Sequence, residues 1–169
     1  MQIYGYPLNL YSVSADFVRN TGTIGYGGGG GGIDNRSKID RISGNFIDNT
    51  CNGYHGGGIA NISGETNTIL GFFLGNNAAW GGGINNQGTI NSLTGNFIGN
   101  YATAGLNGGG LRNFGTINSL SGNFIGNKTI NNDVAGGLMN CNDTAAITLS
   151  ADSKDIIFYS NKDSGFCVG

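Results

Sequence analysis

Residues with the chemistry for catalysis or metal binding are few in this chain, and they are scattered along it. Its 169 residues include ten acidic side chains and one histidine, His55. A site that cleaves saccharides needs carboxylates that converge on the substrate, either for acid–base work or around a metal. The sequence has no Asp-Asp pair, and Asp48 falls where later copies of an internal repeat carry glycine. We therefore expect a non-enzymatic protein with no catalytic residues, no bound cofactor and no metal site.

His55 and the three cysteines form no sequence motif with one another. His55 lies in the segment Thr-Cys-Asn-Gly-Tyr-His-Gly, and we interpret it as a solvated loop imidazole. Cys51, Cys141 and Cys167 form no Cys-x-x-Cys pair and no His/Cys cluster, so they do not indicate a zinc site. We interpret them as free or buried thiols. If the chain is exported, one disulfide could join Cys141 to Cys167.

The composition excludes several classes of protein. The chain contains 34 glycines and about 25 asparagines, which disfavour helices, so an ordinary helical bundle is excluded. One proline and 38% hydrophobic residues argue against a disordered linker. The net charge of −2 without a basic stripe gives no footprint for nucleic acid. No apolar run is long enough for a transmembrane helix, and the first 20 residues do not resemble a signal peptide.

An internal repeat decides the fold. Residues 86–100 and 113–127 differ at only two positions, and weaker copies occupy 35–49 and 61–76. Each copy contains the anchor Phe-x-x-Asn, and each is preceded by a Gly-Gly-(Ile/Leu)-x-Asn anchor. The first anchor begins at Phe17, Phe46, Phe73, Phe97, Phe124 and Phe158. The second anchor spans Gly31–Asn35, Gly57–Asn61, Gly82–Asn86, Gly109–Asn113 and Gly136–Asn140.

Short apolar runs repeated about every 26 residues predict an all-β, right-handed parallel β-helix of about six turns. Alternation over so few residues suits short strands and excludes a ten-residue helix. We expect a single domain over residues 1–169, as a segment of a longer surface protein. Within it, residues 1–16 form an N-terminal cap or partial turn, 17–161 carry the repeats, and 162–169 form the C-terminal end.

The anchors have structural roles in this fold. We expect Phe46, Phe73, Phe97 and Phe124 to stack inside the solenoid as an aromatic ladder, with ladders of Ile and Leu beside them. We expect a column of stacked amides at one corner, where asparagine tolerates a left-handed backbone. This column consists of Asn49, Asn76, Asn100 and Asn127. A second column, with the same role at another corner, consists of Asn35, Asn61, Asn86, Asn113 and Asn140.

The alternating anchors resemble those of the chlamydial polymorphic outer-membrane proteins and, more broadly, of β-helical autotransporter passengers. The motifs that carry the resemblance are GGGI at 30–33, 56–59 and 81–84, GGGL at 108–111, AGGL at 135–138 and the six Phe-x-x-Asn sites. They extend from Phe17 to Asn161. The resemblance implies an adhesin segment, either exposed on a bacterial cell surface or secreted as part of a longer chain.

The length of the repeat varies mainly between the Phe-x-x-Asn asparagine and the next Gly-Gly anchor, whereas the distance from the anchor asparagine to the next phenylalanine is 11 or 12 residues in the four repeats between Asn35 and Phe124. Insertions in solenoids form loops on one edge, which is often the binding edge. These segments carry large side chains with an apolar face and a polar tip, namely Tyr26, Tyr54, His55, Trp80 and Tyr101. We expect a ligand, if the chain has one, to contact Tyr54, His55, Trp80 and Tyr101. An alternative is that these side chains only cover the loop backbone.

The predicted function is therefore adhesion to a host glycan or surface protein, or a role as a rigid stalk. Two alternatives remain. The open ends of a β-helix could pair with other copies, which would make the chain a self-associating structural solenoid. The same architecture also occurs in polysaccharide-processing enzymes of the pectate-lyase-like class, although their convergent carboxylates are not apparent here.

Overall fold

A computed structural model gives the structure of the chain. It describes residues 1–3, 9–23, 29–104, 107–130, 135–141, 145–147, 156–159 and 161, and the backbone of 166–168. The described residues form only strands and the segments that join them. No helix that could cross a membrane occurs among them.

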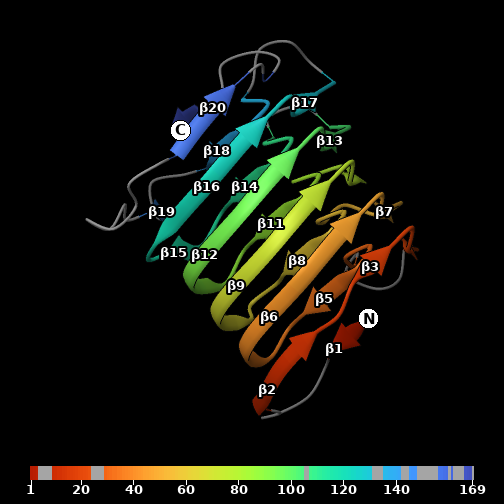
Figure 1. Cartoon of the computed structure of the whole chain (residues 1–169), viewed down its shortest axis with the longest axis vertical. Coiled ribbons are helices and arrows are strands. Elements are labelled where there is room, and N and C mark those ends of the chain that lie inside the picture. The colour runs from red at the N-terminus through yellow and green to blue at the C-terminus, as the bar shows by residue number, and fades with distance from the viewer. Residues whose placement is uncertain are drawn as a thin grey trace.

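The strands assemble into three parallel sheets, which we number in the order in which the chain enters them (Figure 1). The first sheet consists of β1 (Gln2–Ile3), β5 (Ile33–Asn35), β8 (Ile59–Asn61), β11 (Ile84–Asn86), β14 (Leu111–Asn113), β18 (Leu138–Asn140) and β21 (Phe166–Val168). The second sheet consists of β2 (Asn9–Ser14), β3 (Phe17–Val18), β6 (Lys38–Ile47), β9 (Glu65–Leu74), β12 (Thr89–Ile98), β15 (Thr116–Ile117), β16 (Leu120–Ile125), β19 (Ala146–Ile147) and β20 (Ile156–Tyr159). The third sheet consists of β4 (Thr21–Gly22), β7 (Thr50–Cys51), β10 (Asn77–Ala78), β13 (Tyr101–Ala102) and β17 (Lys128–Thr129).

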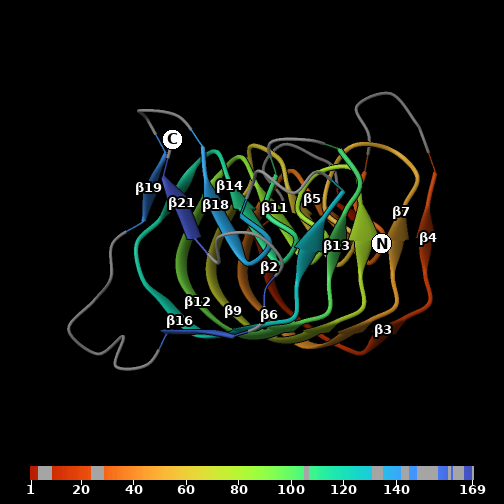
Figure 2. The ribbon, with the colours of Figure 1, turned by 90° about the horizontal axis from the view of Figure 1, so that it is seen from above.

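Each turn of the chain passes through the three sheets in the same order, and Figure 2 shows the turns stacked behind one another. The prediction of a parallel β-helix is therefore confirmed. Five turns have strands in all three sheets, and a sixth has described strands in the first two. Since β1 and β2 pair in register with β5 and β6, the described part of residues 1–16 belongs to a first turn.

The register of the second sheet aligns equivalent repeat positions and fills the interior. Phe46, Phe73, Phe97 and Phe124 are fully buried, and their rings stack at centroid distances of 4.6–4.9 Å. Phe17 and Phe158 extend this ladder at its two ends. A column of aliphatic side chains lies beside the ladder and has one exception, Thr66. Its hydroxyl accepts a hydrogen bond of 3.2 Å from the Asn35 amide, which satisfies a buried polar group.

The asparagine ladder next to the phenylalanines joins the turns by a repeated hydrogen-bond pattern. The backbone N–H and the side-chain Nδ2 of Asn76 both donate to Asn100 Oδ1, at 3.0 and 2.9 Å. The same Nδ2 also donates to the Phe46 carbonyl in the preceding turn, at 2.8 Å. The second column, from Asn35 to Asn140, is linked by side-chain amide bonds of 2.7–2.8 Å.

The expectation that these asparagines adopt the left-handed backbone was wrong. The residue before each asparagine of the first column has the positive φ, and that residue is Arg19, Asp48, Gly75, Gly99 or Gly126, with φ from 52° to 64°. Asparagine is selected here for its amide, because one side chain accepts two bonds from the turn before it and donates to both neighbouring turns.

Apart from an insertion between Asn140 and Phe158 in the sixth turn, most of the length variation of the repeat lies between the third and first sheets. We call this side of the solenoid the loop edge and define it as residues 52–58, 79–83, 103–104 and 107–110. Its Gly-Gly pairs allow close approach of adjacent turns. A Cβ at Gly109 would collide with the backbone of Lys128 and Gly136.

Candidate binding surface on the loop edge

The loop edge brings three of the four predicted contact residues together. Tyr54 and Trp80 come from successive turns, and their rings lie 5.0 Å apart. A hydrogen bond of 2.7 Å from the Trp80 N–H to the Tyr54 carbonyl fixes the two loops against each other, and His55 forms a parallel bridge with Trp80. Tyr54 is 57% exposed, so this aromatic pair faces solvent.

The fourth predicted residue, Tyr101, is placed differently from the expectation. It lies in strand β13 of the third sheet and not in a loop, and the Lys128 ammonium lies 5.2 Å from its ring centroid. The expectation that Tyr101 lies in a loop was therefore wrong, and its role as a ligand contact stays a prediction. Tyr26 lies outside the described residues.

Arg112 is the charged centre of this surface, and the sequence analysis did not single it out. It is the residue between Leu111 and Asn113 in its Gly-Gly-Leu-x-Asn anchor, so it points out of the first sheet. Its guanidinium carbon lies 4.0 Å from the centroid of Phe114 and 4.8 Å from that of Trp80. Arg112 is nevertheless only 8% exposed, because loops and neighbouring side chains cover it.

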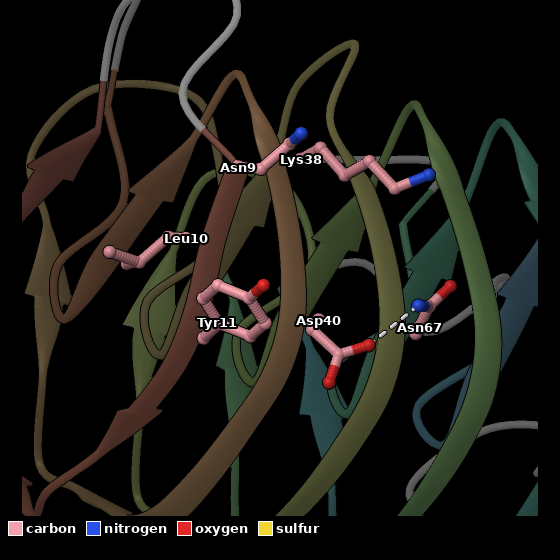
Figure 3. Close-up of a pocket in the computed structure, with 6 residues that line it drawn as sticks. All are labelled: Asn9, Leu10, Tyr11, Lys38, Asp40 and Asn67. Carbon is pink, nitrogen blue, oxygen red and sulfur yellow. Dashed lines mark hydrogen bonds between the residues drawn. The ribbon is translucent and has the colours of Figure 1, made fainter.

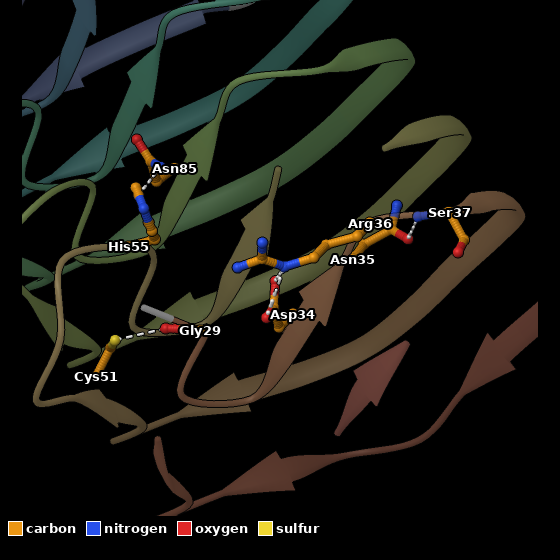
Figure 4. Close-up of polar contacts among 8 residues, drawn as sticks. All are labelled: Gly29, Asp34, Asn35, Arg36, Ser37, Cys51, His55 and Asn85. Carbon is orange, nitrogen blue, oxygen red and sulfur yellow. Dashed lines mark hydrogen bonds and ion pairs between the residues drawn. The ribbon is translucent and has the colours of Figure 1, made fainter. Parts of the chain in front are cut away.

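Polar contacts connect Arg112 to His55 through one amide. Arg112 Nη1 donates to Asn85 Oδ1 at 2.9 Å, which directs the Nδ2 end of that amide toward His55. Asn85 Nδ2 then lies 2.9 Å from His55 Nδ1 (Figure 4), and Gln87 Nε2 lies 3.2 Å from the same nitrogen. Both amide nitrogens are donors, so Nδ1 accepts and the imidazole is neutral with its proton on Nε2.

The interpretation of His55 as a solvated loop imidazole was wrong. The side chain is 8% exposed, and burial lowers its pKa from 6.5 to about 4, with the positive charges of Arg112 and Arg36 acting in the same direction. A second proton on Nδ1 would also oppose two amide donors. The histidine is a fixed hydrogen-bond acceptor of this surface.

Other polar groups beneath the loops are paired (Figure 4). The Arg36 Nε lies 3.2 Å from Asp34 Oδ2, and the Cys51 thiol donates to the Gly29 carbonyl at 2.6 Å. Burial is the main cause that raises the pKa of Cys51. Cys51 and Cys141 are buried in the thiol form, so the disulfide suggested for Cys141 is not formed. The side chain of its suggested partner, Cys167, lies outside the described residues.

Depressions lined by described residues lie on two sides of the solenoid. One, of about 450 Å³, lies along the loop edge and is bounded by Tyr54 from one turn, Asn77 and Ala79 from the next, and Thr103 from the turn after. The other, of about 210 Å³, lies on the outer face of the second sheet (Figure 3). There Tyr11, which is 86% exposed, lies beside Asp40, whose carboxylate accepts a 2.7 Å bond from Asn67.

Within the part of the chain that the structure describes, no three His, Cys, Asp or Glu side chains are grouped closely enough to hold a metal ion. Comparison with known proteins finds no matching family model, curated protein or solved structure. Function therefore has to be argued from the loop edge itself.

The sequence contained a signal for the residues that were missed. In the Gly-Gly-(Ile/Leu)-x-Asn anchor the x residue must face outward, because the positions on either side of it are buried in the ladders. The x residues are Asp34, Ala60, Asn85, Arg112 and Met139. These side chains differ in every turn, whereas the anchor around them is repeated.

Proposed function

We propose that this chain is a non-enzymatic passenger segment of a bacterial cell-surface protein, and that it binds a saccharide through its loop edge. The observation that carries the proposal is the exposed Tyr54 ring, which lies 5.0 Å from the Trp80 ring at a tilt of 33° on a backbone held by hydrogen bonds. Aromatic rings offer large, rigid contact area at a small entropic cost, and they dominate the energy of many recognition sites. The likeness of the anchors to those of chlamydial polymorphic outer-membrane proteins supports the surface role.

The depression beside Tyr54 supports a ligand that lies along the solenoid axis. Its walls come from three successive turns, which are spaced by the strand separation of about 4.8 Å. An extended oligosaccharide can contact several turns at once, and the amide and hydroxyl side chains of Asn77 and Thr103 offer it hydrogen-bond partners. The stacked ladders keep these turns in register, so the surface is formed before the ligand arrives.

Glycan-array binding and adhesion of coated beads to epithelial cells test the proposal. Tyr54→Ala removes the exposed ring, and we expect binding to weaken at least about tenfold, the usual effect of losing an aromatic anchor. Tyr11→Ala is the matched control, because it removes an even more exposed tyrosine from the second sheet. Loss of binding in Tyr11→Ala and not in Tyr54→Ala would move the site to the depression of Figure 3. Absence of binding by the folded wild-type chain would reject adhesion and leave a stalk.

End-to-end association is a second candidate function, favoured by the polarity of the asparagine ladder. Each asparagine donates to the side-chain oxygen of the next asparagine toward the C-terminal end. Among the described residues, Asn20 Oδ1 therefore accepts no hydrogen bond, and Asn161 donates only to the Phe124 carbonyl. A second copy could continue the ladder from one end to the other. Light scattering that rises with concentration, and that Asn20→Lys abolishes, would support it.

A further inference from the structure

The guanidinium of Arg112 has unused hydrogen-bonding capacity. Nη1 donates to Asn85 Oδ1, and the Cys141 thiol is a further hydrogen-bond partner of the side chain. Arg112 Nε is buried and has no hydrogen-bond partner. Nearly all buried side-chain donors in proteins are paired, so an unpaired donor on a charged group calls for an explanation.

The charge of Arg112 is also not balanced within its surroundings. Its hydrogen-bond partners are an amide and a thiol, and it forms no ion pair with the described carboxylates. The Asp34 carboxylate, three strands away in the first sheet, contacts Arg36. Burial lowers the pKa of Arg112, although guanidinium groups stay protonated in proteins. A buried cation without an anion is costly, and an anion at the Nε edge would offset that cost.

The geometry points to one kind of anion. The rings of Trp80 and Phe114 both lie near the guanidinium carbon, and a guanidinium forms its hydrogen bonds at its edge. The Nε edge of an arginine matches the two oxygens of a carboxylate, which it binds through parallel hydrogen bonds. Phe114 is 38% exposed and is the more accessible of the two rings, so its displacement would open this edge to a ligand.

We propose that the loop edge binds acidic saccharides, and that Arg112 receives the carboxylate of a uronic-acid residue while the Tyr54 and Trp80 rings pack against the sugars. The inference rests on the proposed function and adds the substrate class. The chain carries an overall charge of −2, so a general attraction of polyanions does not account for such a preference.

The experiment titrates the wild-type chain with glucuronic-acid oligosaccharides and with the same oligosaccharides after reduction of their carboxyl groups. Trp80 is the only tryptophan and lies beside Arg112, so its fluorescence reports binding. We expect the acidic form to bind at least about tenfold more tightly, the effect of one charge-assisted bidentate contact. Sulfated oligosaccharides of matched charge form a third arm, and we expect them to bind more weakly than the uronates.

Variants of Arg112 and a control at Lys128 locate the contact. Arg112→Gln should reduce the acidic-over-neutral preference to about onefold, whereas Lys128→Gln, which removes an exposed cation on the third sheet, should keep it. Arg112→Lys retains the charge but not the paired donors, and we expect it to lose most of the preference. Circular dichroism and melting curves check that each variant is folded. If the Arg112 variants do not fold, Phe114→Ala keeps the arginine and should strengthen acidic binding by uncovering it.

Equal binding of acidic and reduced oligosaccharides by the wild-type chain would overturn the inference and leave the proposed function standing. Binding of neither would reject both. A preference that Lys128→Gln removes and Arg112→Gln preserves would show that the anion binds elsewhere.

Discussion

The buried asparagine ladder should contribute far more to stability than an exposed ladder built from the same residues. Asn100 is fully buried, accepts two hydrogen bonds from Asn76, and donates through its side chain to Asn127 Oδ1 and to the Phe73 carbonyl, both at 2.9 Å. Asn100→Ala leaves the Asn76 N–H, one Asn76 amide hydrogen and the Phe73 carbonyl without these partners. At about 1–3 kcal/mol for each of these three buried unsatisfied groups, we expect a loss of about 3–9 kcal/mol in the free energy of unfolding.

Asn118→Ala is the matched control on the outer face of the second sheet. Asn118 Nδ2 donates to Asn91 Oδ1 at 2.8 Å, so the bond resembles those of the buried ladder, but the side chain is exposed. Water replaces the lost partner, and the expected cost is at most about 0.5 kcal/mol.

Urea denaturation followed by circular dichroism and by Trp80 fluorescence measures both costs, and coincidence of the two signals tests whether unfolding is two-state. Similar losses in the two variants would refute the reasoning, because hydrogen bonding would then stabilise the turns independently of burial. A small loss in Asn100→Ala alone would show that the turns relax enough to pair the orphaned groups again.

Two further predictions concern the loop edge and the turns. Because folding lowers the pKa of His55 from 6.5 to about 4, the unfolded state binds more protons between these values, and stability falls as the pH falls through this window. The loss should be about 2–3 kcal/mol between pH 7 and pH 4. It is measured as the urea midpoint, and an unchanged pH dependence in His55→Gln would contradict it. Gly109→Ala should abolish folding or cost several kcal/mol through backbone collision, whereas Gly99→Asn should cost at most about 1 kcal/mol, since φ is +61° but space is open. Melting temperatures compare the pair, and equal shifts would show that steric contact between turns is not the constraint.

The fold could be predicted from the sequence because each turn repeats the same constraints. Phe97 and Phe124 occupy equivalent positions in nearly identical repeats. A period of about 26 residues places such positions side by side in successive turns of a solenoid, and not together on one face of a helix. Once strands of adjacent turns pair in register, equivalent side chains lie next to each other and form the ladders. The backbone prediction was wrong at Asp48 and Asn49. Both positions recur in every turn, so the repeat alone does not show that the first has the positive φ and the second supplies the buried amide.

The candidate site could be predicted only in part, since a repeat says where loops lie and not which way they fold. Tyr54 and Trp80 were found because large side chains in variable segments are visible in the sequence. The burial of His55 depends on Asn85 and Gln87 in a later turn, 30 and 32 residues away. No local pattern connects them, and only the register of the first sheet brings them together.

The two nearly identical repeats provide an internal comparison that bears on function. Residues 86–100 and 113–127 differ at two positions, and one of these places Gln87 in the first repeat and Phe114 in the second. The x residue just before each repeat also differs, with Asn85 in one turn and Arg112 in the next. All four side chains lie in the cluster around His55 and Trp80, while the residues that form the inner ladders are unchanged. Interior stability requires the same residue in every turn, whereas a binding surface requires different residues in successive turns. The other difference, Thr94 in the first repeat and Ser121 in the second, lies on the exposed face of the second sheet. The differences therefore avoid the ladders, and the change from Asn85 and Gln87 to Arg112 and Phe114 is what a recognition site on the loop edge predicts.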